Sequence, residues 1–312
     1  MKYRSLLPLI LIGSITFGFS AVCQAACTLT LTTSNVSVSW DLGFASQAVS
    51  FTLNKNGQAC NYKVGLTAGG TGAGNYTTRR MLAGTTQLPY QLYKDSGLSK
   101  ILEDGTAITV ANGFVGSFPN GNNRSVTLTY YLAIPSQSPL KPSGSYTDTY
   151  SVNAYEDTTL RTTASVTLTT TVPKTTELSQ VATGQAFDSG QSNQSLNFGT
   201  LTSSGGTTLS YDLLVRSNAG YSVTLSSQNN GALKHAASGI TQTLPYSFSV
   251  NSVSYNLTGS STVPVTVATG TGQTLTSGVR NTVSITPSSI TDLDVLSGTY
   301  TDNITVTTTV TE

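Results

Sequence analysis

Apolar and polar residues alternate along several stretches of the chain, which is the period of a β-strand with one buried face. In residues 125–134, SVTLTYYLAI, every second residue from Val126 to Ile134 is apolar. Residues 164–172 and 303–310 alternate in the same way, with Thr or Ser between the apolar positions. Clusters of Gly, Asn, Ser and Pro separate these stretches, and no amphipathic helical pattern stands out. We therefore predict an all-β protein built from β-sandwiches.

Three phrases occur twice, in the same order. They are YKVGL at 62–66 with YSVTL at 221–225, LPY at 88–90 with LPY at 244–246, and SGSYTD at 143–148 with SGTYTD at 297–302. Their offsets are 159 (221 − 62), 156 (244 − 88) and 154 (297 − 143) residues. A nearly constant offset predicts two copies of one domain. The boundary falls near Pro173, which gives an N-terminal domain over 26–172 and a C-terminal domain over 173–312.

The two copies differ after the last repeated phrase. In the first copy 24 residues (172 − 148) follow Asp148, enough for two strands, whereas 10 (312 − 302) follow Asp302. The second sandwich is therefore expected to lack its last strand and to need one from a partner. An alternative alignment matches 166–172 with 304–310 at an offset of 138 and removes this deficit. The first alignment is preferred because SGxYTD is the more specific phrase.

The first 25 residues predict a secretory signal peptide. Lys2 and Arg4 precede the apolar run LLPLILIGSITFGFSAV, and Cys23-Gln24-Ala25 forms a cleavage site before Ala26. A retained membrane anchor and a lipid-modified cysteine are the alternatives. The mature chain would begin almost directly with a strand, without an arm that it could donate. We expect export through the periplasm to the cell surface.

Cleavage of the signal peptide would leave two cysteines, Cys27 and Cys60. An exported chain meets an oxidising compartment, so these two residues are expected to form a disulfide. Two cysteines with no histidine nearby argue against a metal site. No cofactor is predicted.

Charge and residue inventory favour a binding protein over an enzyme. Only 9% of residues are charged and the net charge is +1, so a nucleic-acid partner is not expected. The one histidine, His235, lies in a polar stretch and is interpreted as an ordinary surface residue. Asp148 and Asp302 are interpreted as structural turn residues. Arg79-Arg80 is interpreted as a solvated pair at a strand start, with contact to an anionic glycan or surface as the alternative.

Several large apolar residues lie among turn-forming residues and are candidates for surface binding. Phe114, Val115 and Phe118 occur in NGFVGSFPNGNN, Leu140 in PSQSPLKPS, and Tyr76 in GAGNYTT. One interpretation is that these loops gather at one pole as an exposed apolar patch that binds surfaces. The alternative for the phenylalanines is burial at the end of the sandwich.

Several of these phrases together resemble the spore coat protein U family, the pilin-like domains of archaic (Csu-type) chaperone–usher pili. The phrases are the early cysteines, RRM at 79–81, LPYQLYKD at 88–95, AIP at 133–135 and SGSYTD. The second copy keeps LPYSF and SGTYTD but has no cysteine. The resemblance implies two immunoglobulin-like, pilin-type sandwiches, an adhesin followed by a pilin. It also implies three partners: a periplasmic chaperone, an outer-membrane usher and an adjacent pilin subunit.

Two functions remain as hypotheses at this point. The first is a pilus tip adhesin that binds an abiotic or host surface, promotes biofilm formation, and accepts a donor strand beside Ile304, Val306 and Val310. The second is a structural coat or stalk protein with two complete sandwiches. A glycan-binding tip lectin would differ from the first only in its ligand.

Overall fold

The structure is a computed structural model that describes residues 27–41, 43–71, 75–136, 141–291 and 295–311. The regular secondary structure of these residues consists entirely of β-strands, as the alternating pattern predicts. Within those ranges we find no helix with the length and apolar character that crossing a bilayer requires. The predicted signal peptide and Leu140 lie outside the described residues.

The first eleven strands form the N-terminal sandwich. They are β1 (Thr28–Thr32), β2 (Val36–Ser39), β3 (Ala45–Asn56), β4 (Cys60–Leu66), β5 (Arg80–Ala83), β6 (Thr86–Pro89), β7 (Gln91–Tyr93), β8 (Phe114–Phe118), β9 (Arg124–Ile134), β10 (Gly144–Glu156) and β11 (Thr159–Val172). One sheet has the order β1-β3-β9-β7. The facing sheet has the order β2-β11-β10-β4-β8, and β5 and β6 extend it through a pairing with β10.

The remaining strands form the C-terminal sandwich. They are β12 (Thr176–Ala182), β13 (Leu209–Ser217), β14 (Gly220–Ser227), β15 (Ala232–His235), β16 (Thr243–Val250), β17 (Val253–Tyr255), β18 (Val265–Gly270), β19 (Val279–Pro287), β20 (Tyr300–Thr301) and β21 (Ile304–Thr311). The larger sheet has the order β12-β13-β19-β16-β15-β20, with β17 paired to β16. The smaller sheet has three strands in the order β18-β14-β21.

Each sandwich has its own apolar core between its two sheets. In the N-terminal sandwich, Trp40, Leu53 and Leu132 are at most 1% exposed. In the C-terminal sandwich, Leu213 and Val223 are fully buried. Every second residue of the long strands supplies these side chains, which is why the period of two was visible in the sequence.

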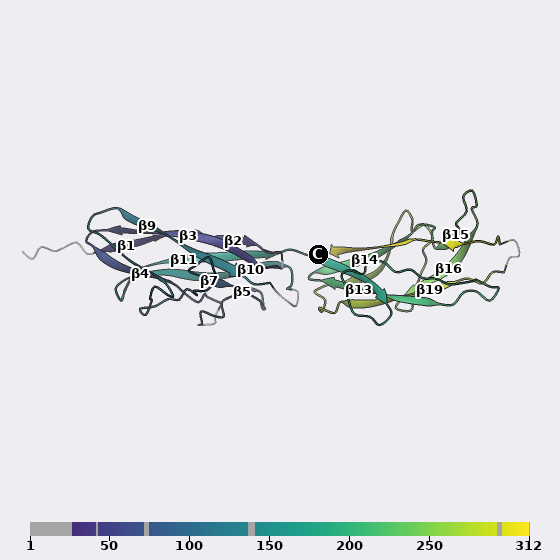
Figure 1. The fold of residues 1–312 in the computed structure, drawn as a ribbon, viewed down its shortest axis with the longest axis horizontal. Helices are drawn as coiled ribbons and strands as arrows, with labels where there is room; N and C mark the ends of the chain where they lie inside the picture. Colours follow the sequence, from purple (N-terminus) through teal and green to yellow (C-terminus); the bar gives the residue numbers. More distant parts are fainter. Residues whose placement is uncertain (1–26, 42, 72–74, 137–140, 292–294, 312) are drawn as a thin grey trace, which may run out of the picture.

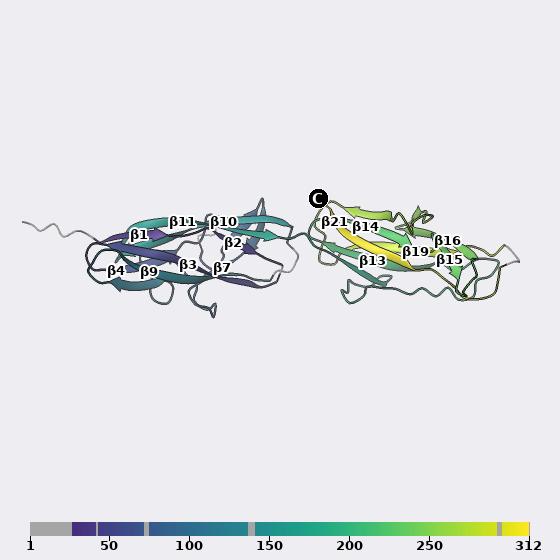
Figure 2. The same ribbon diagram turned by 90° about the horizontal axis from the view of Figure 1, so that it is seen from above.

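The two sandwiches lie end to end along the long axis of the molecule (Figure 1 and Figure 2). A linker of three residues, Pro173–Thr175, joins β11 to β12. Asn218 fixes this linker: its side-chain amide donates to the Pro173 carbonyl at 2.8 Å and accepts from the Thr175 amide at 2.8 Å. Its own carbonyl accepts from the Ser143 amide of the N-terminal sandwich at 2.9 Å. One buried asparagine thus connects both sandwiches.

Cys27 and Cys60 form the predicted disulfide, with a Cα–Cα distance of 6.1 Å and a sequence separation of 33 residues. It connects Cys27, the residue directly in front of β1, to the first residue of β4. The bridge therefore joins the two sheets of the N-terminal sandwich.

Replacing both cysteines by serine is expected to destabilise the N-terminal sandwich by about 3–4 kcal/mol, because the unfolded chain loses a closed loop. Trp40, the single tryptophan, is buried in this sandwich and reports its unfolding by fluorescence. The unfolding transition of the C-terminal sandwich, followed by circular dichroism, serves as the internal control and should stay unchanged. An unshifted Trp40 transition would contradict the prediction.

Candidate functional site at the open edge of the C-terminal sandwich

Strand β21 takes the place in the C-terminal sandwich that β10 takes in the N-terminal sandwich. β10 pairs antiparallel with β4, with Val152 opposite Leu66. β21 pairs antiparallel with β14, with Val306 opposite Leu225. These two pairs are related by the offsets of the repeated phrases, 159 for the leucines (225 − 66) and 154 for the valines (306 − 152).

This pairing decides between the two alignments of the copies. β11, which contains residues 166–172, pairs with β10 and β2, whereas β21 pairs with β14. The alternative match of 166–172 with 304–310 is therefore wrong. The counterpart of β21 is β10, and β11 has no counterpart strand among the described residues of the C-terminal sandwich.

The absence of a second neighbour in the described chain leaves one edge of β21 open. Tyr150 and Val152 of β10 are at most 1% exposed, because β11 packs beside them. Their counterparts on β21, Ile304 and Val306, are only half-buried, and Val310 is 39% exposed. A strand edge of this kind presents unpaired backbone N–H and C=O groups together with apolar side chains.

A groove with a volume of about 1410 Å³ runs along this open edge. Its walls are β21 with the segment 295–303 on one side and residues 192–201 on the other. The apolar side chains of its floor come from the larger sheet and include Tyr211, Leu233, Leu244 and Ile285. The volume exceeds the roughly 300–1,000 Å³ typical of pockets for small molecules. The groove suits an extended chain better than a compact ligand.

Asp302, two residues before β21, is held by a tyrosine from another repeated phrase. The Tyr246 hydroxyl donates to its carboxylate at 2.6 Å, and Tyr90 donates to Asp148 at 2.6 Å in the N-terminal sandwich. Burial, together with these hydrogen bonds, raises the pKa of both tyrosines above its usual value, so both hydroxyls remain donors. The phrases LPY and SGxYTD therefore recur because they meet in space. Asp148 lies within β10 and is 3% exposed, so the expected turn position is wrong for it.

His235 is buried, contrary to the expectation of a surface residue. It is 9% exposed, its Nδ1 accepts from the Ala237 amide at 3.1 Å, and its ring packs edge-on against Tyr300. Its Nε2 lies 3.3 Å from the Ser297 carbonyl. The ring fixes the segment that leads into β21, and this packing could not be inferred from its polar sequence neighbours.

The phenylalanines predicted for surface binding are buried, which corrects that assignment. FVGSF forms β8, and β8 pairs with β4, so the turn-like sequence around it hid a strand. Phe114 and Phe118 are 8% and 6% exposed, and Phe118 packs on Tyr62 at 5.0 Å between ring centroids. Val115, between them on the outer face, is 41% exposed.

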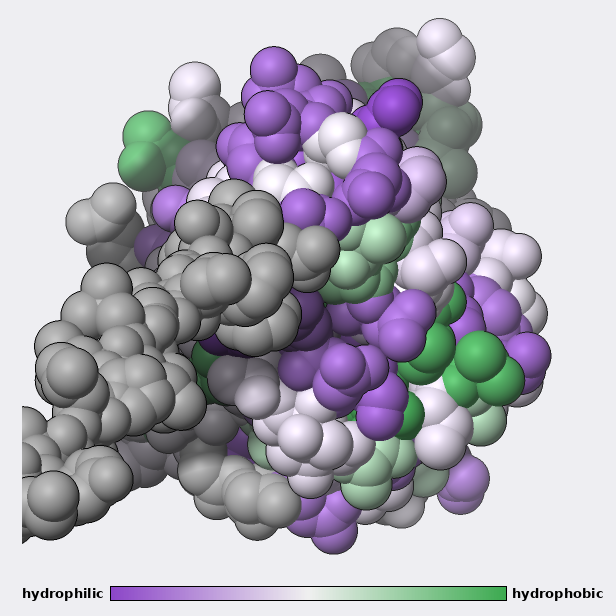
Figure 3. Space-filling view, turned by 90° about the vertical axis from the view of Figure 1, so that its left-hand side faces the viewer, coloured by the Kyte–Doolittle hydropathy of each residue, from purple (hydrophilic) through white to green (hydrophobic). Residues whose placement is uncertain are grey.

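Tyr76 is half-buried and is engaged within the N-terminal sandwich. Its hydroxyl donates to the Asp104 carbonyl at 3.1 Å, and the Arg79 guanidinium lies 5.4 Å from the centre of its ring. Figure 3 views the molecule from the N-terminal end and shows a few separate groups of hydrophobic atoms among hydrophilic ones, beside the grey atoms. The buried phenylalanines supply no such patch, and Leu140 lies outside the described residues.

Replacing Phe118 by serine is expected to cost the N-terminal sandwich about 3 kcal/mol or more, because it leaves a cavity in the core. The matched control is Val115→Ser in the same strand, which should change the stability by about 0.5 kcal/mol or less. Urea unfolding followed by Trp40 fluorescence measures both. Equal effects of the two substitutions would contradict the burial of Phe118.

Arg79 is neither a solvated residue nor a surface contact. It is 1% exposed and donates to the carbonyls of Leu66, Thr67, Leu102 and Tyr76 at 2.7–3.3 Å. A further bond, of 2.5 Å, goes to the side chain of Gln91. Burial lowers the pKa of its guanidinium. The arginine thereby ties together segments that are distant in sequence, and the phrase RRM gave no sign of this.

Arg80 fits the expectation of a surface position better. It is half-buried and bonds to Gln87 Oε1 at 3.0 Å and to the Thr71 carbonyl at 3.3 Å. Arg80 is the first residue of β5 and Arg79 directly precedes it. Adjacent residues of an extended chain point to opposite sides, so one arginine enters the protein while the next stays at the surface.

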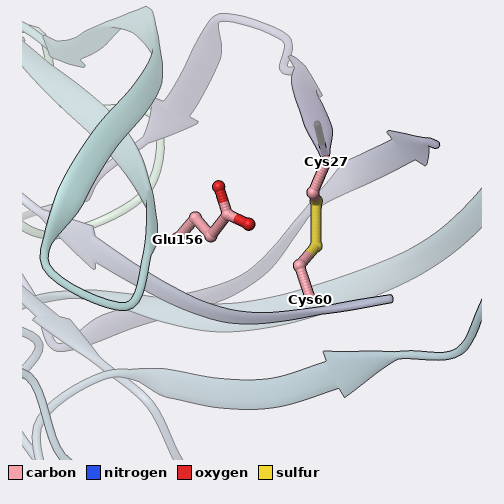
Figure 4. Close-up of side chains that lie close together, drawn as sticks. All are labelled: Cys27, Cys60 and Glu156. Atoms are coloured by element: carbon pink, nitrogen blue, oxygen red, sulfur yellow. A yellow bond between two sulfur atoms is a disulfide. The ribbon is translucent and has the colours of Figure 1, made fainter. Parts of the chain in front are cut away.

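Glu156 lies near the two disulfide sulfurs (Figure 4). The three side chains resemble a set of metal ligands in type and distance. Both sulfurs are joined in the disulfide, so neither can be the thiolate that binds a metal. This group is therefore interpreted as structural.

Residues 14–153 match the family model of the Spore Coat Protein U domain. No curated protein matches the sequence. Several solved structures are similar over most of the chain. A chain of the CsuC–CsuE chaperone–tip adhesion subunit complex of Acinetobacter baumannii is 16% identical, with a TM-score of 0.47 and coverage of 91% of this chain and 99% of that chain. The CupB6 tip adhesin of Pseudomonas aeruginosa is 12% identical, with a TM-score of 0.38 and coverage of 90% and 93%.

About half of the chain is similar to the CssB subunit of enterotoxigenic Escherichia coli, whose structure is complemented with a donor strand from CssA. It is 17% identical, with a TM-score of 0.27 and coverage of 47% of this chain and 97% of that chain.

Proposed function

We propose that this protein is the tip adhesin of an archaic chaperone–usher pilus, since residues 14–153 match the family model of the Spore Coat Protein U domain. In this proposal the N-terminal sandwich contacts an abiotic or host surface and promotes biofilm formation. The C-terminal sandwich is a pilin domain that accepts a strand from the adjacent subunit. A periplasmic chaperone covers the same groove before assembly, and an outer-membrane usher delivers the subunit to the cell surface.

The open edge of β21 is the observation that carries this proposal. Ile304 and Val306 line the groove with their side chains half-buried, beside a row of backbone groups that has no partner strand in the described chain. A strand added from another chain would satisfy the backbone through β-augmentation and bury the side chains. A coat protein with two complete sandwiches would have no use for such an edge.

Surface contact is assigned to exposed side chains of the N-terminal sandwich. Val110 and Val115 are 67% and 41% exposed, while Phe114 and Phe118 are excluded by their burial. Single apolar contacts of this size are weak. Many fibres with one tip each would bind a surface through avidity.

Immunogold labelling of the full-length protein, tagged at the mature N-terminus, tests the proposal in its source bacterium. We expect label at the ends of surface fibres. Val306→Lys places a charge in the groove and should remove the label from fibres, whereas Thr307→Lys, on the exposed face of the same strand, should not. Label spread over the cell surface without fibres would support the coat alternative and contradict the proposal.

A further inference from the structure

The end of the N-terminal sandwich that lies away from the linker is made by two loops and a turn. β11 runs from the turn at 157–158 to the linker at 173–175, so the turn and the linker lie at opposite ends. Loops 57–59 and 119–123 lie at the end with the turn, because the first residues of β4 pair there with β10 and with β8. We call these two loops the distal loops. Hydrophilic residues cover much of this end (Figure 3).

Three asparagine side chains join the distal loops to each other. Asn120 and Asn122 accept through Oδ1 from two backbone amides of loop 57–59, at 2.8 and 3.0 Å. Asn56, next to that loop, accepts in the same way from the Asn123 amide at 2.7 Å. A backbone amide can only donate, so the atom that faces it is Oδ1, and the Nδ2 group points away from it. The three asparagines are exposed, and no described residue accepts a hydrogen bond from their Nδ2 groups.

A buried lysine lies behind the distal loops. Lys55 is 1% exposed, and its ammonium group donates to the carbonyls of Gly57, Pro119 and Gly121 at 2.5, 3.1 and 2.9 Å. These bonds turn three loop carbonyls inward. Neither of the two ion pairs that the described residues form includes Lys55, so its charge has no acidic partner there. A buried positive charge without a counter-ion favours an anion on the surface outside it.

An exposed arginine lies against the same loops. The Nε and Nη2 atoms of Arg124 lie 3.4 Å from the position that a Cβ atom would take at Gly121, so the guanidinium lies beside this glycine. Arg124 also has no ion-pair partner among the described residues. In and beside the turn, Arg161 pairs with Glu156 at 2.5 Å, and Asp157 is the other acid. Together with the buried lysine, these residues give the end a net charge of +1 (3 − 2).

We propose that the distal loops form a binding site for an acidic polysaccharide, whose carboxylate or sulfate groups accept from the three Nδ2 groups and from the Arg124 guanidinium. Donors predominate in this site, because three of its carbonyls bind Lys55 and its three Oδ1 atoms bind backbone amides. Oxygen atoms that only accept suit such a site better than hydroxyl groups, which also donate. The donors are held in place before binding, which reduces the entropy lost on binding.

An acidic polysaccharide fits this surface better than an anionic membrane. Recognition of anionic lipids typically uses a cluster of about four to eight Lys and Arg residues, whereas Arg124 is the one exposed cation beside the distal loops that has no acidic partner. The distal loops also contain no large apolar side chain that could enter a bilayer. This inference rests on the proposed function in one respect, the assignment of surface contact to the N-terminal sandwich.

Binding of the full chain to immobilised alginate and dextran sulfate tests the proposal, with uncharged dextran as the reference. We expect binding to alginate, to dextran sulfate or to both, which weakens as the salt concentration is raised, and no binding to dextran. Absence of binding to both acidic polysaccharides, or equal binding to dextran, would overturn the proposal. Stronger binding to phosphatidylglycerol vesicles than to either polysaccharide would overturn it in favour of a membrane ligand.

The immunogold experiment described above separates this inference from the proposed function. Label at the ends of fibres, formed by a chain that binds neither acidic polysaccharide, would overturn the inference and leave the proposed function standing. Binding to an acidic polysaccharide by a chain that is spread over the cell surface without fibres would support the site and contradict the proposed function.

Asn120→Asp combined with Asn122→Asp removes two outward donors while each new carboxylate still accepts from loop 57–59. We expect binding to the acidic polysaccharides to weaken about tenfold or more. Urea unfolding followed by Trp40 fluorescence should stay unchanged, because the bonds between the loops are kept. Unchanged binding in this folded variant would overturn the role of the asparagines.

The control makes the same change of charge at two other exposed asparagines, Asn75→Asp combined with Asn256→Asp. Their Oδ1 atoms also accept from backbone amides, those of Thr77 and Thr258, both at 2.9 Å. The control pair should weaken binding by less than about twofold, since both positions are outside the distal loops. Equal losses for the two pairs would show that overall charge is the cause and would overturn the site.

A second comparison does not depend on the asparagines. Arg124→Gln should weaken binding about fivefold or more, because it removes the exposed cation of the site. Arg161→Gln removes the same charge at the same end, where the guanidinium is already paired with Glu156, and should weaken binding about twofold or less. Equal effects of the two substitutions would contradict the placement of the ligand on the distal loops.

Discussion

A grafted chain, in which a copy of residues 157–172 is joined after Val310 in place of Thr311 and Glu312, is expected to unfold in its C-terminal sandwich at a temperature about 10 °C or more above that of the native chain. The copy can fold back along β21 as β11 folds back along β10, because Val310 lies opposite Tyr221 as Glu156 lies opposite Tyr62. The physical reason is burial of apolar surface at the open edge of β21. Copies of Val166 and Leu168 would enter the groove, and each such side chain contributes about 1.5–3 kcal/mol when buried. The backbone groups on the free edge of β21 would also gain partners, as those of β10 have in β11.

Calorimetry resolves this effect because the N-terminal sandwich provides an internal standard. Its transition, assigned by the fluorescence of Trp40, should stay in place while the other moves. A control graft carries serine in place of the copied Val166 and Leu168. It adds the same number of residues without these apolar side chains and should give little stabilisation. If both grafts stabilise equally, or neither does, the apolar groove does not accept a strand in the register of β11.

Arg79→Met is expected to destabilise the N-terminal sandwich by about 3 kcal/mol or more. Methionine has a similar length but no donors, so the carbonyls of Leu66, Thr67 and Leu102 would lose the hydrogen bonds that Arg79 donates. The Tyr76 carbonyl and Gln91 Oε1 would keep one donor each, the Gln91 side-chain amide and the Leu92 amide. An unsatisfied buried acceptor costs about 1–3 kcal/mol, and part of this cost is recovered because the buried charge is removed. The net effect remains large because several acceptors are affected together.

Arg80→Met provides the matched control, since it makes the same chemical change one residue further on. Arg80 is half-buried, and we expect its substitution to cost about 1 kcal/mol or less. Urea unfolding followed by Trp40 fluorescence compares the two variants in the sandwich that contains them. A loss of stability for Arg80→Met as large as that for Arg79→Met would show that the buried hydrogen-bond cluster is not the cause.

The period of two and the repeated phrases were sufficient to predict the all-β class and the missing strand. These patterns are informative for two reasons. A strand with one buried face has apolar residues at every second position, and a strand pairing that occurs in both domains has similar residues in both copies. The tyrosine–aspartate bonds explain why LPY and SGxYTD were the phrases that persisted. Each phrase supplies one partner of a buried bond, Tyr246 with Asp302 in one sandwich and Tyr90 with Asp148 in the other.

Individual side-chain environments were harder to predict. The glycines and asparagines around FVGSF indicated a loop, although this stretch pairs with β4 and buries both phenylalanines. The polar sequence neighbours of Arg79 and His235 indicate surface positions, although both side chains are buried by contacts with other segments. Tertiary contacts decide burial for such residues, and local composition does not contain that information.

The strands of both sandwiches run close to the long axis of the molecule (Figure 1 and Figure 2). Hydrogen bonds between antiparallel strands lie across the strand direction, so tension along the axis loads them in shear. β10 and β11 share 13 residue pairs, which would have to yield together under such a pull. A sideways force would instead peel the pairs apart one after another. The molecule is therefore mechanically anisotropic, strongest against a load applied from end to end.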